Sequence, residues 1–259
     1  MRATAVKVAD VELEVFDSGS GTGAPILFLH GMLGFDRRQP FVSLLAENGR
    51  VVAPSHPGFG ASSLPDWLDS MDDIAHLYLE LMDRQKLDGA DLVGCSIGGW
   101  IAAEMATKAP ERFRRLVLAA PVGIKVGPAD KLDIPDIFAM PDADVQKLLY
   151  REPARMARDT SKMPEAELAA LFRARETLAL LVWEPWMHNP KLKRRLHRIA
   201  APTLFLRGVS DGLVSQAYLD AYARLLPDAH TLTIEGAGHM PELEQPGSFA
   251  SAVNKFLGA

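Results

Sequence analysis

The sequence has little cysteine, no long apolar run and no excess of positive charge. Cys95 is the single cysteine among the 259 residues, so no disulfide can form within the chain. No apolar segment approaches the ~18 residues that a membrane-spanning helix needs, and the first residues lack the hydrophobic stretch of a signal peptide. We therefore expect a cytoplasmic protein without a membrane span.

The charge balance is slightly acidic. Lys and Arg number 28, Asp and Glu number 33, and the formal net charge is −5. A surface that binds nucleic acid needs clustered excess Lys and Arg to neutralise phosphates, so we expect no nucleic-acid partner. The hydrophobic fraction of 48% is ordinary for a globular protein. The length suits one sizeable core with a small insertion, and the oligomeric state stays open.

Short apolar runs alternate with segments of helical character through most of the chain. Residues 25–29 form a continuous apolar run, and residues 116–120 and 203–206 have a similar character. Such runs are typical of strands that are covered on both faces. Their alternation with helices predicts an α/β fold, in which a mainly parallel sheet is flanked by helices.

Residues 122–200 interrupt this alternation. They contain helical patches near 142–149 and 165–183, but no run with strand character. We therefore predict that this segment forms an inserted helical cap, and that residues 1–121 together with 201–259 form the core.

Ser96 lies at the centre of a Gly-x-Ser-x-Gly pentapeptide, residues 94–98. The residues before it resemble the end of a buried strand, and those after it resemble an apolar helix. A strand that turns abruptly into a helix places its middle residue at the tip of a strained turn, which requires small neighbours such as Gly94 and Gly98. The predicted geometry exposes the Ser96 hydroxyl at a helix N-terminus, where free N–H groups stabilise negative charge.

A serine nucleophile needs a base and a group that orients the base. His239 follows the last predicted strand, and it alone among the seven histidines combines that position with flexible glycine neighbours. Asp211 follows the predicted strand 203–206, although an ordinary turn residue beside Gly212 is the alternative interpretation. The order Ser, Asp, His favours a catalytic triad in which Ser96 is the nucleophile, His239 the base and Asp211 the orienting acid.

An oxyanion hole requires two backbone N–H groups directed at the developing negative charge. Ile97, the residue after the predicted nucleophile, supplies the first. The loop after residues 25–29 reads His30-Gly31-Met32-Leu33-Gly34, and the Met32 N–H is the best second donor, with Leu33 as the alternative. We expect His30 to brace this loop.

These features together resemble an α/β-hydrolase-fold serine hydrolase of the esterase type, with an inserted helical cap. The resemblance rests on His30-Gly31, residues 57–62 (Pro-Gly-Phe-Gly-Ala-Ser), Ser96, Asp211 and His239, in the family's order. It implies an eight-stranded, mostly parallel sheet. It also implies hydrolysis without cofactor or metal, through an acyl-enzyme on Ser96.

The cap is expected to form one wall of the substrate pocket. Trp183, Trp186 and His188 belong to its most unusual stretch, and aromatic side chains suit an adaptable apolar pocket. Anchoring of the cap on the core is the alternative role for the two tryptophans. Leu33 and Met240 are further pocket candidates, because they lie beside the predicted oxyanion donor and the predicted base.

Three other side chains near the predicted site have open roles. His56 precedes the Pro-Gly-Phe-Gly loop and is a further candidate for the pocket wall. Arg37 and Arg38 follow the oxyanion loop, where an Arg could bind a substrate carboxylate, but a surface position is favoured for both.

The sequence therefore favours a serine carboxylic-ester hydrolase that acts on small to medium acyl esters. One alternative is a carbon–carbon bond hydrolase of diketone or dienoate substrates with the same triad. Family members of that kind often have a Gly-rich loop after His-Gly and a Trp after the catalytic His, where this chain has Met32-Leu33 and Met240. A second alternative is a slow or inactive member that binds a small molecule. The fold alone does not decide among them.

Overall fold

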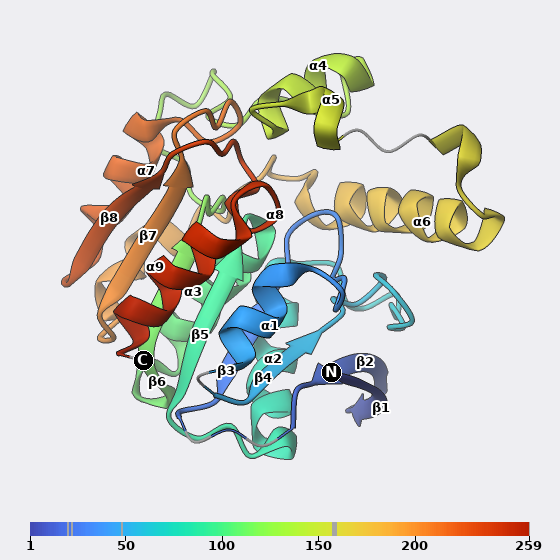
Figure 1. The fold of residues 1–259 in the computed structure, drawn as a ribbon. Helices are drawn as coiled ribbons and strands as arrows, with labels where there is room; N and C mark the ends of the chain where they lie inside the picture. Colours follow the sequence, from blue (N-terminus) through green and yellow to red (C-terminus); the bar gives the residue numbers. More distant parts are fainter. Residues whose placement is uncertain (20, 22, 48, 157–159, 259) are drawn as a thin grey trace.

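A single eight-stranded sheet forms the centre of the computed structural model, which describes residues 1–258 except 20, 22, 48 and 157–159 (Figure 1). The strands lie in the order β1-β2-β4-β3-β5-β6-β7-β8. Their bounds are β1 Arg2–Val8, β2 Val11–Asp17, β3 Ile26–Leu29, β4 Val51–Pro54, β5 Ala90–Cys95, β6 Phe113–Ala119, β7 Thr203–Gly208 and β8 Ala229–Ile234.

Most of the sheet is parallel. Among the described strands, β2 alone has the opposite direction and pairs antiparallel with both β1 and β4, whereas every pairing from β4 to β8 is parallel. All four residues of β3 are buried, as a strand covered on both faces requires. The predicted α/β fold with a mostly parallel, eight-stranded sheet is thereby confirmed.

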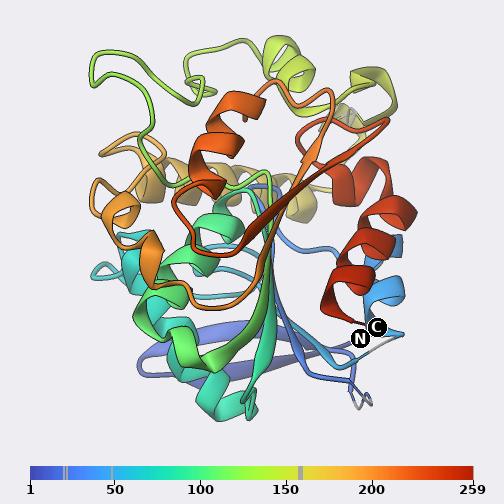
Figure 2. The same cartoon turned by 90° about the vertical axis from the view of Figure 1, so that its left-hand side faces the viewer.

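Helices cover both faces of the sheet, which Figure 2 shows nearly edge-on between them. Separate apolar clusters fill the two spaces between sheet and helices. One cluster includes side chains of α2 (Met71–Gln85), α3 (Ile97–Lys108) and α7 (Gln216–Ala223), and the other includes side chains of α1 (Pro40–Ala46) and α9 (Pro246–Leu257). This sandwich fixes the strand ends from which the loops of the site emerge.

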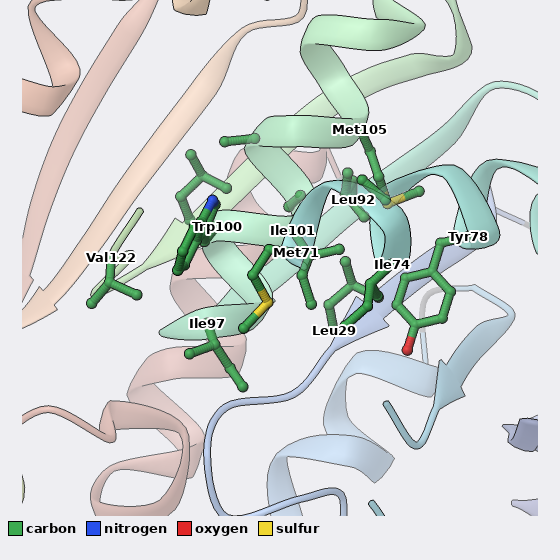
Figure 3. Packing of buried hydrophobic residues seen from close by; sticks show 14 of the residues in the cluster. Leu29, Met71, Ile74, Tyr78, Leu92, Ile97, Trp100, Ile101, Met105 and Val122 are labelled. Atoms are coloured by element: carbon green, nitrogen blue, oxygen red, sulfur yellow. The ribbon is translucent and has the colours of Figure 1, made fainter. Parts of the chain in front are cut away.

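Helix α2 illustrates how local sequence and packing agree. The Ser70 hydroxyl accepts a hydrogen bond from the Asp73 N–H and so caps the helix. Met71, Ile74 and Tyr78 recur at helical spacing and are almost fully buried. Figure 3 shows these side chains among the apolar residues that surround the start of α3.

The segment between β6 and β7 carries α4 (Asp142–Leu149), α5 (Pro153–Met156) and α6 (Glu165–Val182), which lie together at one end of the sheet (Figure 1). Helix α6 is tied to the loop before α2. The Arg173 guanidinium donates to the Ser62 carbonyl at 2.6 Å, and the Thr177 hydroxyl donates to the Gly58 carbonyl at 3.3 Å. The division into a core and a cap at residues 122–200 stays a prediction, and residues 20, 22, 48, 157–159 and 259 of the predicted domains lie outside the described residues.

None of the described helices combines the length and the apolar character that crossing a bilayer requires.

Candidate active site

Ser96 lies at a strained turn between β5 and α3. Its backbone φ is 53°, in the left-handed region that is costly for a residue with a side chain. The turn is closely packed, because a side chain at Gly94 would collide with the Gly98 carbonyl and one at Gly98 would collide with the Leu29 carbonyl. The two glycines therefore allow the turn that holds the Ser96 hydroxyl at the sheet edge.

The structure brings Ser96, His239 and Asp211 into one hydrogen-bonded chain. His239 Nε2 lies 2.9 Å from Ser96 Oγ, and His239 Nδ1 lies 3.0 Å from Asp211 Oδ2. The three residues follow β5, β8 and β7, which run parallel, so their loops meet at the same edge of the sheet. All three are at least 94% buried, which excludes most competing water.

Asp211 is held by bonds beyond the one to His239. Its Oδ1 accepts from the Leu213 and Val214 N–H groups at 2.8 and 2.9 Å. The Arg207 guanidinium donates to the Asp211 carbonyl and to the Val214 carbonyl. The two N–H groups orient the carboxylate, and the guanidinium fixes the loop that carries it.

Asp211 makes His239 a stronger base. Burial by itself lowers the pKa of His239, but the charge and hydrogen bond of Asp211 outweigh it, so the net pKa of His239 is raised. A base of this kind takes up a proton more readily than a free imidazole does.

Glu244 secures the His239 loop, a role that the sequence interpretation missed. Its two carboxylate oxygens accept from the Gly238 N–H at 2.6 Å and the Arg151 N–H at 2.9 Å. The His239 N–H donates to the Leu149 carbonyl at 2.7 Å. The only sequence signal for this role of Glu244 is an acid shortly after a loop histidine. One of the two hydrogen-bond partners of Glu244 lies in the segment between β6 and β7.

The loop after β3 lies against the Ser96 turn. A β-carbon on Gly31 would come 3.5 Å from Ser96 Cβ, which is ordinary contact. Ile97 begins α3, so its N–H has no acceptor within the helix. Among the described residues, no acceptor is found for the Met32 N–H. Both N–H groups are thus available at the turn, and their role as oxyanion donors stays a prediction.

The comparisons with known proteins agree with this geometry. The sequence model of the alpha/beta hydrolase family matches residues 26–252. This chain belongs to the alpha/beta hydrolase family. The resemblance inferred from the motifs is thereby confirmed.

Similar proteins within the family differ in their reported activities. The chain is 27% identical to a 2-hydroxymuconate semialdehyde hydrolase of Pseudomonas sp. (strain CF600), over 92% of this chain and 88% of that protein. A thermophilic esterase from Thermogutta terrifontis has a similar structure, with a TM-score of 0.79, 22% identity and coverage of 100% of this chain and 98% of the other. A meta-cleavage product hydrolase from Pseudomonas fluorescens IP01 has a TM-score of 0.77, 20% identity and coverage of 98% and 97%.

Two cavities flank the loop after β3. The cap cavity, of about 350 Å³, lies between Met32 of this loop and residues of α4 to α6. The second, of about 310 Å³, is lined by Met240 and Glu242 and is called the Glu242 cavity below. Leu33 lines both cavities and Met240 lines the Glu242 cavity, and their role in a substrate pocket stays a prediction.

The prediction that His56 lines the pocket is wrong. His56 is fully buried, its Nε2 donates to the His30 carbonyl at 2.8 Å and its Nδ1 accepts from the Tyr78 hydroxyl at 2.7 Å. Burial and the neighbouring His30 hold the pKa of His56 well below its usual range. Burial also lowers the pKa of His30 to about 4, and the His30 ring bonds the Gly31 carbonyl and the His56 N–H. The pair braces the loop in its neutral form.

Trp183, Trp186 and His188, the three residues predicted for the cap side of the pocket, line neither cavity, and their role in a substrate pocket stays a prediction. Trp183 is 59% exposed at the surface. Trp186 donates to the Ile134 carbonyl and packs edge-on against Phe138, so it supports the cap cavity from behind. His188 lines a separate hollow beside α2, and no triad residue lines this hollow or either of the two cavities. The path of the chain after α6 sets the positions of these three side chains. The aromatic pattern of the sequence does not reveal that path.

The two arginines have the surface positions that the sequence favours. Arg38 is exposed and forms an ion pair with Asp36 at 3.0 Å, and Arg37 is exposed and donates to the Met1 carbonyl. Within the described part of the chain, no group of three or more His, Cys, Asp or Glu side chains is arranged to hold a metal ion.

Proposed function

We propose that this protein is a serine carboxylic-ester hydrolase. The observation that carries the proposal is the hydrogen-bonded chain from Ser96 Oγ through His239 to Asp211, at 2.9 and 3.0 Å. These distances lie within the range in which a base can take the hydroxyl proton. A buried, paired carboxylate behind the imidazole keeps its reactive tautomer and stabilises the imidazolium that forms.

The reaction then proceeds in two halves. Ser96 Oγ bonds to the ester carbonyl carbon while His239 takes the hydroxyl proton, and the Met32 and Ile97 N–H groups hold the oxyanion. His239 gives this proton to the leaving alcohol as the carbon–oxygen bond of the ester breaks. Water, deprotonated by His239, attacks the acyl-enzyme, and the acid leaves as Ser96 regains its proton.

The cap cavity suits the acyl part of the substrate. Its wall is mainly apolar and includes Ile137, Val145 and Leu178. A volume of about 350 Å³ is near the lower end of ligand pockets, which run from roughly 300 to 1,000 Å³. Small to medium acyl chains fit such a space.

A carbon–carbon bond hydrolase is the second candidate, because two similar proteins are named a 2-hydroxymuconate semialdehyde hydrolase and a 2-hydroxy-6-oxo-2,4-heptadienoate hydrolase. A dienoate carries a carboxylate, which calls for a cation in the pocket. The arginines that line the two cavities are already paired, Arg38 with Asp36 and Arg175 with Asp142 at 3.0 Å each. This pairing favours the ester.

The test is hydrolysis of p-nitrophenyl esters, from acetyl to long acyl, by the wild type and by Ser96→Ala. We expect activity that is greatest for short and medium chains and that vanishes in the variant. A fluorophosphonate probe provides the control, since it should label the wild type and leave Ser96→Ala unlabelled. Absence of ester turnover by a labelled wild type would favour the slow, ligand-binding alternative, and faster turnover of a dienoate than of any ester would favour carbon–carbon cleavage.

A further inference from the structure

Glu242 is a buried carboxyl group for which the proposed reaction has no use. It lies in the short helix α8 (Pro241–Glu244), three residues after His239, and it is 8% exposed. Its Oε2 has no hydrogen-bond partner among the described residues. This oxygen is itself covered by protein atoms. Buried polar atoms without a partner are rare and costly in native proteins, so the carboxyl group of Glu242 costs stability that the fold does not recover.

Glu242 is not needed to hold the loop that carries His239. Glu244, two residues later, performs that task with both of its carboxylate oxygens, which accept from the Gly238 and Arg151 N–H groups. The buried position of Glu242 therefore calls for another explanation.

The Glu242 cavity provides one. It has a volume of about 310 Å³, and its wall includes Gly31 and Leu33 of the loop beside Ser96 together with Met240 and Glu242, which follow His239. The base that protonates the leaving alcohol is His239 in the proposed reaction. The alcohol part of an ester must therefore lie on the His239 side of Ser96, and Met240 and Glu242, which follow His239 in the sequence, line this cavity.

The charges on the cavity wall favour a group that donates hydrogen bonds. Arg38 is neutralised by Asp36 at 3.0 Å, and His30 is buried with a pKa lowered to about 4 by that burial. Glu167 and Glu242 are the other carboxyl groups on the wall, and Glu167 also lies within electrostatic range of Arg38. Burial raises the pKa of Glu242 to about 7, while its own N–H and the nearby His239 act in the opposite direction. A hydroxyl or an ammonium group satisfies such a wall, and a carboxylate does not.

We propose that the Glu242 cavity binds the alcohol part of the ester and that Glu242 selects alcohol parts bearing a hydroxyl or ammonium group. This inference rests on the proposed esterase function and names its substrate class. Glu242 then determines specificity and takes no part in catalysis, because it contacts the alcohol part away from the ester bond that breaks.

Three esters that share the butyryl group test the proposal: pentyl, 4-hydroxybutyl and 4-(dimethylamino)butyl butyrate. The first two have the same number of heavy atoms and differ in one terminal group. We expect the wild type to have a kcat/KM at least ~10-fold higher for the two polar esters than for pentyl butyrate, since a buried acceptor discriminates against a ligand that leaves it unpaired.

Two substitutions assign the preference to Glu242. Glu242→Leu should abolish it for both polar esters while pentyl butyrate is still hydrolysed, which also shows that the variant folds. Glu242→Gln keeps an acceptor without charge, so it should retain part of the hydroxyl preference and lose the ammonium preference. Glu167→Gln removes the other carboxyl group of the wall and should leave both preferences in place.

The outcomes are separable. If the wild type hydrolyses pentyl butyrate without preferring the polar esters, or if Glu242→Leu keeps the preference, the inference is overturned and the esterase function stands. Loss of the preference in Glu167→Gln but not in Glu242→Leu also overturns the assignment to Glu242. If the wild type hydrolyses none of the three esters or the p-nitrophenyl series, the proposed function fails and the inference falls with it.

Discussion

The buried carboxyl of Glu242 predicts a specific dependence of stability on pH. Its pKa is raised from the ordinary value of 4.5 to about 7 by burial. Between these two values the folded protein binds a proton at Glu242 that the unfolded chain does not bind. The free energy of unfolding therefore falls as the pH rises from about 4.5 through about 7, because stability decreases wherever the native state holds more protons.

The magnitude follows from the shift. A rise of about 2.5 pKa units, at 1.36 kcal/mol per unit, corresponds to about 3 kcal/mol. The amide of Glu242→Gln does not titrate. Relative to Glu242→Gln, the wild type should therefore lose about 3 kcal/mol of unfolding free energy as the pH rises from ~4.5 to ~8. Most of this loss should occur between pH ~5 and pH ~7.

Urea unfolding followed by tryptophan fluorescence measures this difference, since four tryptophans report on the fold. Taking the difference between two variants removes the contribution of every carboxyl group that does not interact with Glu242. His239 does interact with it, so the same pair is measured in a His239→Gln background. Loss of the imidazolium should enlarge the effect, because that charge lowers the pKa of Glu242. A difference that stays constant within about 0.5 kcal/mol, the scatter of ordinary surface substitutions, would refute the reasoning.

Three further predictions concern the triad, the turn and the cap. Asp211→Asn should fold normally and lose about four orders of magnitude in kcat; near wild-type rates in a p-nitrophenyl ester assay would show that the acid is misassigned. Gly98→Ala should lower the melting temperature sharply or prevent folding, because the new methyl group meets the Leu29 carbonyl. Gly247→Ala has open space around it and serves as the control in the same calorimetric scan. Val145→Phe should fill part of the cap cavity and move the acyl preference to shorter chains, while Trp183→Ala should leave the chain-length profile unchanged; a reversed result would mean that the pocket wall is wrongly assigned.

The sequence revealed the sheet and the grouping of the site residues because these depend on local signals. A Gly-x-Ser-x-Gly turn needs only its own neighbours to be small. Asp211 and His239 each follow a strand, and parallel strands bring their carboxyl ends to one edge whatever the intervening residues are. The meeting of Ser96 with the other two side chains is thus a consequence of topology.

The pocket was harder to predict because it depends on contacts between distant segments. His56 is buried against the hydroxyl of Tyr78, which lies 22 residues further along the chain. It also packs against the His30 ring, whose centroid lies 3.7 Å from the centroid of the His56 ring. Trp183 and Trp186 are three residues apart, yet one is at the surface and the other donates to the Ile134 carbonyl. Aromatic composition alone does not distinguish these environments.

The two glutamates after His239 show the same limit most directly. Glu242 and Glu244 have the same side chain and belong to one short helix, so no local rule separates them. Their roles differ because Arg151, nearly a hundred residues earlier in the chain, presents its N–H to Glu244, whereas Glu242 Oε2 finds no partner among the described residues. Glu244, whose oxygens the fold has satisfied, holds the loop of the base in place, whereas Glu242 lines the cavity that we propose for the alcohol part. The place of Glu242 on that wall is what bears on specificity, and only the folded arrangement identifies it.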